Sequence, residues 1–137
     1  MQQPSVIIIG TGFGGIGAAI RLKQQGVTAL TIFEKAADVG GVWRDNVYPG
    51  AACDVPSHLY SFSFEPKPDW SRRYAEQPEI FAYLKHCVSQ YGLTPHLRLN
   101  TEVASARFDE ARALWCVTLC NGETHEAQVL VTATGQL

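Results

Sequence analysis

The sequence has no excess of basic residues. Its 11 Lys and Arg are outnumbered by 13 Asp and Glu, which leaves a formal net charge of −2. A nucleic-acid-binding surface needs a concentrated basic patch. We therefore expect no nucleic-acid partner, and we interpret the adjacent Arg72 and Arg73 as a solvated basic pair.

Long apolar runs are also missing. No stretch reaches the roughly 18–20 consecutive apolar residues that a membrane-spanning helix needs. The first five residues, Met1 to Ser5, carry no basic segment of the kind that opens a signal peptide. We expect a cytoplasmic protein with no membrane partner.

Cysteine pairs and metal-ligand spacings are absent as well. None of the four cysteines forms a C-x-x-C pair, and the four histidines are scattered without a ligand partner at metal spacing. This favours reduced thiols in a cytoplasm, with no metal site. A disulfide reductase would need a redox cysteine pair soon after Gly40-Gly41, where this chain has Trp43-Arg44-Asp45-Asn46, so we exclude that class. The cysteines are Cys53, Cys87, Cys116 and Cys120.

The sequence does contain a glycine-rich turn between a strand and a helix. A β-branched run over residues 6–9 leads into Gly10, Gly12 and Gly15, which have the G-x-G-x-x-G spacing. The first glycine permits a sharp turn, the second lets a pyrophosphate approach the backbone, and the third lets the helix pack on the strand. We predict a helix over residues 16–25 that ends at Gly26.

A second predicted strand, residues 29–33, ends at Glu34. This carboxylate lies roughly 20 residues beyond the last glycine, where an acid accepts hydrogen bonds from a ribose hydroxyl. A hydrogen bond to a charged group contributes about 1.5–3 kcal/mol. We favour dinucleotide binding over the alternative, which is a solvated glutamate at the end of a strand.

The middle of the chain is predicted to be a long ordered loop followed by a helix. Gly40 and Gly41 indicate a second close approach of the backbone to a ligand. Residues 44–77 are rich in proline and aromatic residues, so we expect an ordered loop that packs on a ligand or another domain. Pro78 begins a helix that Gly92 ends.

Three strands are predicted after this helix, over residues 102–108, 114–119 and 126–132, with a tight hairpin at Asn121-Gly122. The last strand is apolar, as is typical of a parallel strand buried on both faces. It leads into a small-residue turn, 133–137, where a ligand could approach. At 137 residues we expect one α/β domain, a Rossmann-like parallel sheet with a three-stranded β insertion.

Taken in order, these motifs resemble the FAD-binding N-terminal part of Baeyer–Villiger monooxygenases, within the wider flavin-containing monooxygenases. The resemblance covers the whole chain. The more specific motifs are the Gly40-Gly41-Val42-Trp43 box, the stretch from Tyr48 to Asp54, and the run from Tyr60 to Phe64.

The resemblance implies a role for each matching position. The pyrophosphate of FAD would be held by Gly10, Gly12, Phe13, Gly14 and Gly15. Glu34, with Lys35 beside it, would bind the adenosine ribose, and Val103 would lie near the adenine. The flavin side would be lined by Gly41, Val42, Trp43 and Tyr60, with Ala133, Thr134 and Gly135 also against the cofactor.

Two of these positions keep an alternative. Asp54 would lie near the flavin ring and help to place a catalytic arginine and the nicotinamide, but an Asp in such a loop is usually a turn former. Trp43 could serve packing alone. Its position just after the glycine pair, with only Val42 between, favours a cofactor contact.

The resemblance also implies an activity and a limit to it. Members of the family use FAD, NADPH and O₂ to convert ketones into esters or lactones. They are several times longer than this chain, and their NADPH-binding domain and catalytic arginine lie beyond the segment that resembles residues 1–137. We therefore expect a truncated FAD-binding domain, with a sheet incomplete at the C-terminus, that is inactive alone.

Other functions remain open at this point. The chain could be a non-catalytic module that binds FAD or another adenine dinucleotide, or a ligand-free truncated domain that self-associates through exposed sheet edges. An NAD-dependent dehydrogenase shares the first glycine motif. That class does not account for the Gly40–Trp43 box or the long aromatic loop.

Overall fold

A four-stranded parallel sheet forms the centre of the computed structural model, which describes residues 3–136. Its order is β3-β2-β1-β7, and its strands are β1 (Val6–Ile9), β2 (Leu30–Phe33), β3 (Leu97–Arg98) and β7 (Val129–Thr132). β1 pairs with both β2 and β7. Continuous Val/Ile/Leu runs suit such central strands, because both of their faces are covered.

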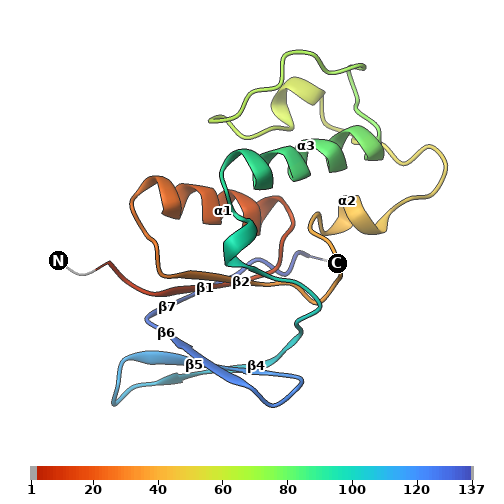
Figure 1. Ribbon diagram of the computed structural model, residues 1–137. Coiled ribbons are helices and arrows are strands. Elements are labelled where there is room, and N and C mark those ends of the chain that lie inside the picture. The colour runs from red at the N-terminus through yellow and green to blue at the C-terminus, as the bar shows by residue number, and fades with distance from the viewer. Residues whose placement is uncertain (1–2, 137) are drawn as a thin grey trace.

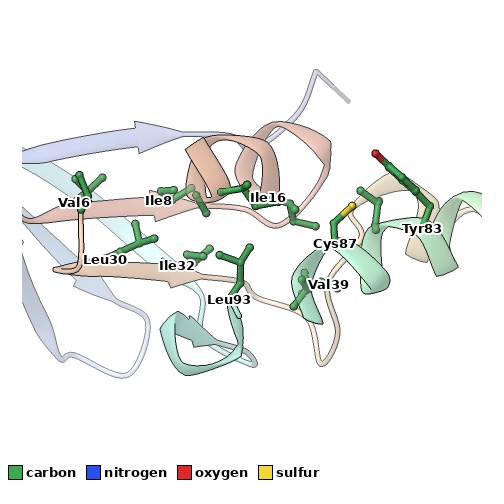
Figure 2. Packing of buried hydrophobic residues seen from close by; sticks show 14 residues of the cluster. Val6, Ile8, Ile16, Leu30, Ile32, Val39, Tyr83, Cys87 and Leu93 are labelled. Carbon is green, nitrogen blue, oxygen red and sulfur yellow. The ribbon is translucent and has the colours of Figure 1, made fainter. Parts of the chain in front are cut away.

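Two helices, α1 (Phe13–Gln24) and α3 (Gln77–Gln90), lie on one side of this sheet (Figure 1). Ile16 and Ile20 of α1 are at most 1% exposed and belong to one core cluster with Ile8 and Ile32 of the sheet. Figure 2 shows Ile16 of α1, Ile8 and Ile32 of the sheet, and Cys87 of α3 within this cluster. The apolar stripes of both helices therefore face a common core, as their spacing predicts.

The predicted ends of α1 are partly right. The helix begins at Phe13, three residues before the predicted start, because the glycine-rich turn itself forms its first turn. The predicted end at Gly26 is confirmed. Gly26 adopts φ +87°, and the Val27 N–H donates to the Leu22 carbonyl at 3.0 Å, which closes the helix.

An antiparallel three-stranded sheet covers the other side of the parallel sheet (Figure 1). Its strands are β4 (Val103–Asp109), β5 (Leu114–Leu119) and β6 (Thr124–Ala127). Val117 and Leu119 of β5 pack in a second core cluster with Ile7 and Phe33. The hairpin predicted at Asn121-Gly122 is confirmed, since the Gly122 N–H donates to the Leu119 carbonyl.

The single strand predicted over residues 126–132 is wrong. The structure divides this segment between β6, which ends at Ala127, and β7, which begins at Val129, and the two strands belong to different sheets. Gln128 lies at the change of sheet, where its backbone N–H and side chain bond to Ser5. The sequence does not predict β3, which is only two residues long.

The segment between β2 and α3 is ordered, as predicted, and contains only short helices. These are α2 (Val42–Asp45) and the 3₁₀ turn η1 (Ser57–Leu59); a further 3₁₀ turn, η2 (Thr94–His96), precedes β3. The aromatic loop packs on α1 and α3, because Phe62 lies 5.2 Å from Phe13 between ring centroids and donates its N–H to Tyr83. Within residues 3–136, no helix has both the length and the apolar character to cross a membrane.

Candidate functional site: a pocket at the carboxyl ends of the parallel strands

A pocket of about 510 Å³ opens where β1, β2 and β7 end. The carboxyl edge of an open parallel sheet is where such folds bind ligands. The glycine turn, Glu34, the α2 segment and the turn after β7 all contribute to its walls. Segments distant in sequence therefore meet at one place.

The N-terminus of α1 faces this pocket. Gly12 is the N-cap residue, and among residues 3–136 no side chain caps the helix with a hydrogen bond. Gly12, Phe13 and Gly14 line the pocket, and the first turn of the helix carries no acidic residue. Unpaired N–H groups and the positive end of the helix dipole are a favourable environment for phosphate.

Two glycines are required by the close approach of backbone segments. Gly10 adopts φ +103°, and a Cβ atom there would collide with the carbonyl oxygen of Ala133. Gly41 adopts φ +54°, and its Cβ atom would lie 3.0 Å from the Cα of Gly12. The glycine turn is thus in contact with both the turn after β7 and the start of α2.

Gly15 has a different position from the other glycines of the motif. A Cβ atom on Gly15 would collide with the carbonyl of Gly10. It lies beneath the turn and lets α1 pack against β1, which is the packing role that the spacing predicts.

Glu34 is the buried charged group of the pocket, with 6% of its surface exposed. One carboxylate oxygen accepts the backbone N–H of Thr11 at 3.2 Å and also the Thr11 hydroxyl. The other accepts the Ala36 N–H at 2.9 Å and lies 3.3 Å from Nη1 of Arg44. Three hydrogen bonds and one ion pair thus stabilise this buried charge.

Arg44 links Glu34 to α2. Its Nε and Nη2 donate to the two carboxylate oxygens of Asp45 at 2.7 and 2.9 Å, and its Nη1 donates to the Asp38 carbonyl at 2.8 Å. The hydrogen bond from Arg44 lowers the pKa of Asp45, and the bond to Asp45 raises the pKa of Arg44. Both groups stay ionised at neutral pH.

The other end of the pocket is aromatic. The indole N–H of Trp43 donates to the hydroxyl of Tyr60 at 3.0 Å, and the ring of Tyr60 lies 4.8 Å from that of Phe13. Burial raises the pKa of Tyr60, so its hydroxyl stays protonated and can both donate and accept. Gln77 of α3 donates to the carbonyl of Trp43.

The structure brings together most of the residues singled out from the sequence. Two are exceptions: Gly15 lies beneath the turn, and Asp54 is exposed outside the pocket. The predicted residues that line the pocket are Gly10, Gly12, Phe13, Gly14, Glu34, Lys35, Gly41, Val42, Trp43, Tyr60, Val103, Ala133, Thr134 and Gly135. Leu137, the last residue of the predicted terminal turn, lies outside the described residues.

Sequence reasoning missed five polar residues of the lining: Thr11, Arg44, Asp45, Thr101 and Glu102. Thr11 occupies a variable position of the glycine motif, so the motif gave no reason to single it out. Arg44 and Asp45 are adjacent charges at the start of a predicted loop, which is typical of solvated residues. Their role depends on the fold of residues 35–45 over the end of β2.

A second hollow, of about 400 Å³, lies between residues 65–69 and α3. Its charged groups pair with one another: Lys67 with Asp69 and Glu79, and Glu65 with His86. It lies away from the carboxyl ends of the strands. We therefore take the first pocket as the candidate site.

Comparisons with known proteins identify the family of this chain. Residues 8–77 match the family of NAD(P)-binding Rossmann-like domains. A Baeyer–Villiger monooxygenase of Streptomyces coelicolor is 52% identical over 136 residues, which are 99% of this chain and 26% of the relative. A Baeyer–Villiger monooxygenase of Pseudomonas aeruginosa is also 52% identical, over 96% of this chain and 25% of its own length.

Solved structures give the same result. An oxidized steroid monooxygenase bound to NADP superposes with a TM-score of 0.90 at 43% identity, covering 98% of this chain and 26% of that one. An open cyclohexanone monooxygenase superposes with a TM-score of 0.91 at 40% identity, covering 100% of this chain and 28% of that one. The chain thus spans about a quarter of the length of the relatives that it matches.

Proposed function

The chain belongs to the family of NAD(P)-binding Rossmann-like domains, and from this premise we propose that it is the FAD-binding portion of a flavoprotein monooxygenase of the Baeyer–Villiger type. One observation carries the proposal. The buried carboxylate of Glu34 and the uncapped N-terminus of α1 open into the same pocket. This arrangement offers one acceptor for a ribose and several donors for a pyrophosphate.

The lining residues fit an adenine dinucleotide. Gly12 and Gly41 bring two stretches of backbone together without side chains, so a pyrophosphate can lie against Gly12, Phe13 and Gly14. Glu34 already accepts three hydrogen bonds and forms one ion pair, so we expect a ribose hydroxyl to take the place of one of these contacts. We expect it to replace Arg44, whose 3.3 Å contact is the longest of the four.

The aromatic end fits the flavin side of the cofactor. Val42, Trp43 and Tyr60 line it, and the bond between Trp43 and Tyr60 holds both side chains in place. When bound, FAD supplies the redox chemistry of such an enzyme. The residues of this chain bind the cofactor, orient it and exclude water from it. Asp54 lies outside the pocket. It would therefore place an arginine by contacting another part of the whole protein.

For the whole protein we propose NADPH- and O₂-dependent oxygenation of a ketone. The relatives named as Baeyer–Villiger monooxygenases support this, and so do solved cyclohexanone monooxygenases with cyclohexanone or ε-caprolactone bound. Residues 1–137 would form the FAD-binding domain, and the NADPH-binding domain would be a separate part. The four free cysteines support a location in the reducing cytoplasm.

A titration with FAD tests the proposal. We expect saturable binding to the purified chain, followed by flavin fluorescence, and at least about tenfold weaker binding to Glu34→Gln, since a hydrogen bond to a charged group contributes about 1.5–3 kcal/mol. The control is Glu110→Gln, which makes the same charge change at an exposed residue outside the pocket. Equal affinities of wild type and Glu34→Gln would contradict the ribose assignment.

A further inference from the structure

Thr11 lies at the junction of three segments that line the pocket. It stands between Gly10 and Gly12, and only 1% of its surface is exposed. Its backbone N–H donates to Oε2 of Glu34 at 3.2 Å, and its hydroxyl donates to the same oxygen. Its carbonyl accepts the N–H of Gly40 at 2.8 Å. One buried residue therefore joins the glycine turn both to the end of β2 and to the segment that leads into α2.

These contacts make the two carboxylate oxygens of Glu34 unlike each other. Both donors of Thr11 bond to Oε2. The other oxygen, Oε1, accepts the Ala36 N–H at 2.9 Å and lies 3.3 Å from Nη1 of Arg44. The terminal torsion of a glutamate is broad unless contacts restrict it, and two donors on one oxygen restrict it strongly. Oε2 is therefore fixed, and Oε1 is the oxygen at which a ligand donor can replace a contact.

Resting on the proposed function, we propose that Thr11 is a positioning residue for ribose recognition: its hydroxyl holds Oε2 of Glu34 and so keeps Oε1 oriented for the ribose of the dinucleotide. In this role Thr11 acts through Glu34. The side chain at a variable position of the glycine motif, and not only the glycines around it, then determines how well the site distinguishes a ribose from a sugar without hydroxyls.

The physical reason is the burial of Glu34, which is 6% exposed, so that little water reaches it to replace a lost donor. Without the Thr11 hydroxyl, Oε2 keeps only the backbone N–H of Thr11, and hydrogen bonds to ionised groups are the stronger ones. The carboxylate then turns to recover a donor, and Oε1 loses its orientation toward a ribose hydroxyl. Phosphate binding at the start of α1 does not use this carboxylate and is retained.

The test compares ADP with 2′,3′-dideoxy-ADP, which share the adenine and the diphosphate and differ only in the ribose hydroxyls. Calorimetry measures the affinity of the chain for each. Thr11→Val removes the hydroxyl and keeps the branched shape of the side chain, whereas Thr11→Ser keeps the hydroxyl and removes the methyl group. The matched control is Thr118→Val, in β5 and outside the pocket.

We expect the wild-type chain to prefer ADP, and Thr11→Val to reduce that preference at least about fivefold with its affinity for the dideoxy analogue unchanged. Thr11→Ser should restore most of the preference, since it retains the donor. Thr118→Val should behave as wild type. A role in packing alone would give the opposite order for the two Thr11 variants, because valine keeps the volume of threonine and serine does not.

Two results would overturn the inference. One is a preference for ADP in Thr11→Val that equals or exceeds that of wild type, and the other is an equal loss of affinity for both ligands. A wild-type chain that binds the two ligands equally, or binds neither, would instead contradict the proposed function, and the inference with it. If Thr11→Val does not fold, the comparison of Thr11→Ala with Thr11→Ser decides the matter in the same way.

Discussion

At the scale of single residues, the site depends on how Glu34 is satisfied. A buried charge is costly unless it is paired and hydrogen-bonded, and Glu34 accepts hydrogen bonds from Thr11 and Ala36 and pairs with Arg44. Thr11 stands between the first two glycines of the motif, so the same turn that exposes the backbone also anchors the carboxylate. The proposed ribose recognition and the shape of the turn are therefore coupled.

The contact between Gly10 and Ala133 gives a residue-scale prediction. Gly10→Ala would force an alanine into a backbone conformation with positive φ and would make its Cβ collide with the Ala133 carbonyl. We expect it to lower the free energy of unfolding by about 3 kcal/mol or more. Urea denaturation of the variant measures this.

The matched control is Gly122→Ala in the β5–β6 hairpin. Gly122 has φ +89°, close to that of Gly10, but a Cβ atom there would meet nothing within 4 Å among the described residues. Its loss should be limited to the conformational cost, about 1–2 kcal/mol. Equal losses in the two variants would show that the contact with Ala133 is unimportant.

The residues of the site were predictable to different degrees. Glu34 and the glycines follow from spacing, because a strand, a turn and a helix fix their relative positions over a short length of chain. Arg44 does not, because its partners Glu34 and Asp38 become neighbours only when the segment after β2 folds back. Asp54 lies outside the pocket, which the resemblance alone did not indicate.

At the scale of elements, Glu65 fastens the aromatic loop to α3. Its carboxylate bonds to His86 within the helix and to the hydroxyl of Tyr91 just after it, each at 2.8 Å. Its backbone carbonyl accepts the hydroxyl of Tyr83 at 2.7 Å. The loop that places Tyr60 in the pocket is thus anchored to α3.

This anchoring should depend on pH. The hydrogen bonds from His86 and then from Tyr91 lower the pKa of Glu65. A lowered pKa in the folded state stabilises the protein above the pKa of an unfolded glutamate, about 4.3, and this stabilisation is lost as the pH falls through the lowered value. Below about pH 5, we expect the free energy of unfolding, measured with urea, to decrease less steeply with falling pH in Glu65→Gln than in wild type.

Glu110→Gln again serves as the control, because this exposed side chain lies in the β4–β5 turn away from α3. It should retain the wild-type dependence on pH. Identical curves for wild type and Glu65→Gln would contradict the assigned anchoring role.

The elements themselves were predictable where a local signal marks their ends. Gly26, Gly92 and the Asn121-Gly122 turn all stand where chain direction changes. The division at Gln128 was not predicted, because β6 and β7 run on with almost no break and differ only in the sheet that pairs with them. The pairing of β6 with β5 depends on tertiary packing, which the alternation of apolar and polar residues along one strand does not indicate.

At the scale of the whole molecule, one parallel sheet is covered by α1 and α3 on one side and by β4–β6 on the other (Figure 1). Both coverings leave the carboxyl edge of the sheet accessible, and the pocket forms there. The fold class follows from the sequence because the βαβ pattern at the start is local. The position of the small sheet depends on Phe33 and Val117 meeting in the second core cluster.

The most direct measurement of the central claim is a backbone amide NMR titration of the chain with FAD. We expect saturable shifts at Gly12, Phe13 and Gly14, which line the pocket at the start of α1, and at Lys35 beside Glu34. Amides of the β4–β5 turn, around Glu110, should not move. Shifts confined to the hollow around Lys67 and His86, or no saturable shift at the start of α1, would contradict FAD binding in the proposed pocket.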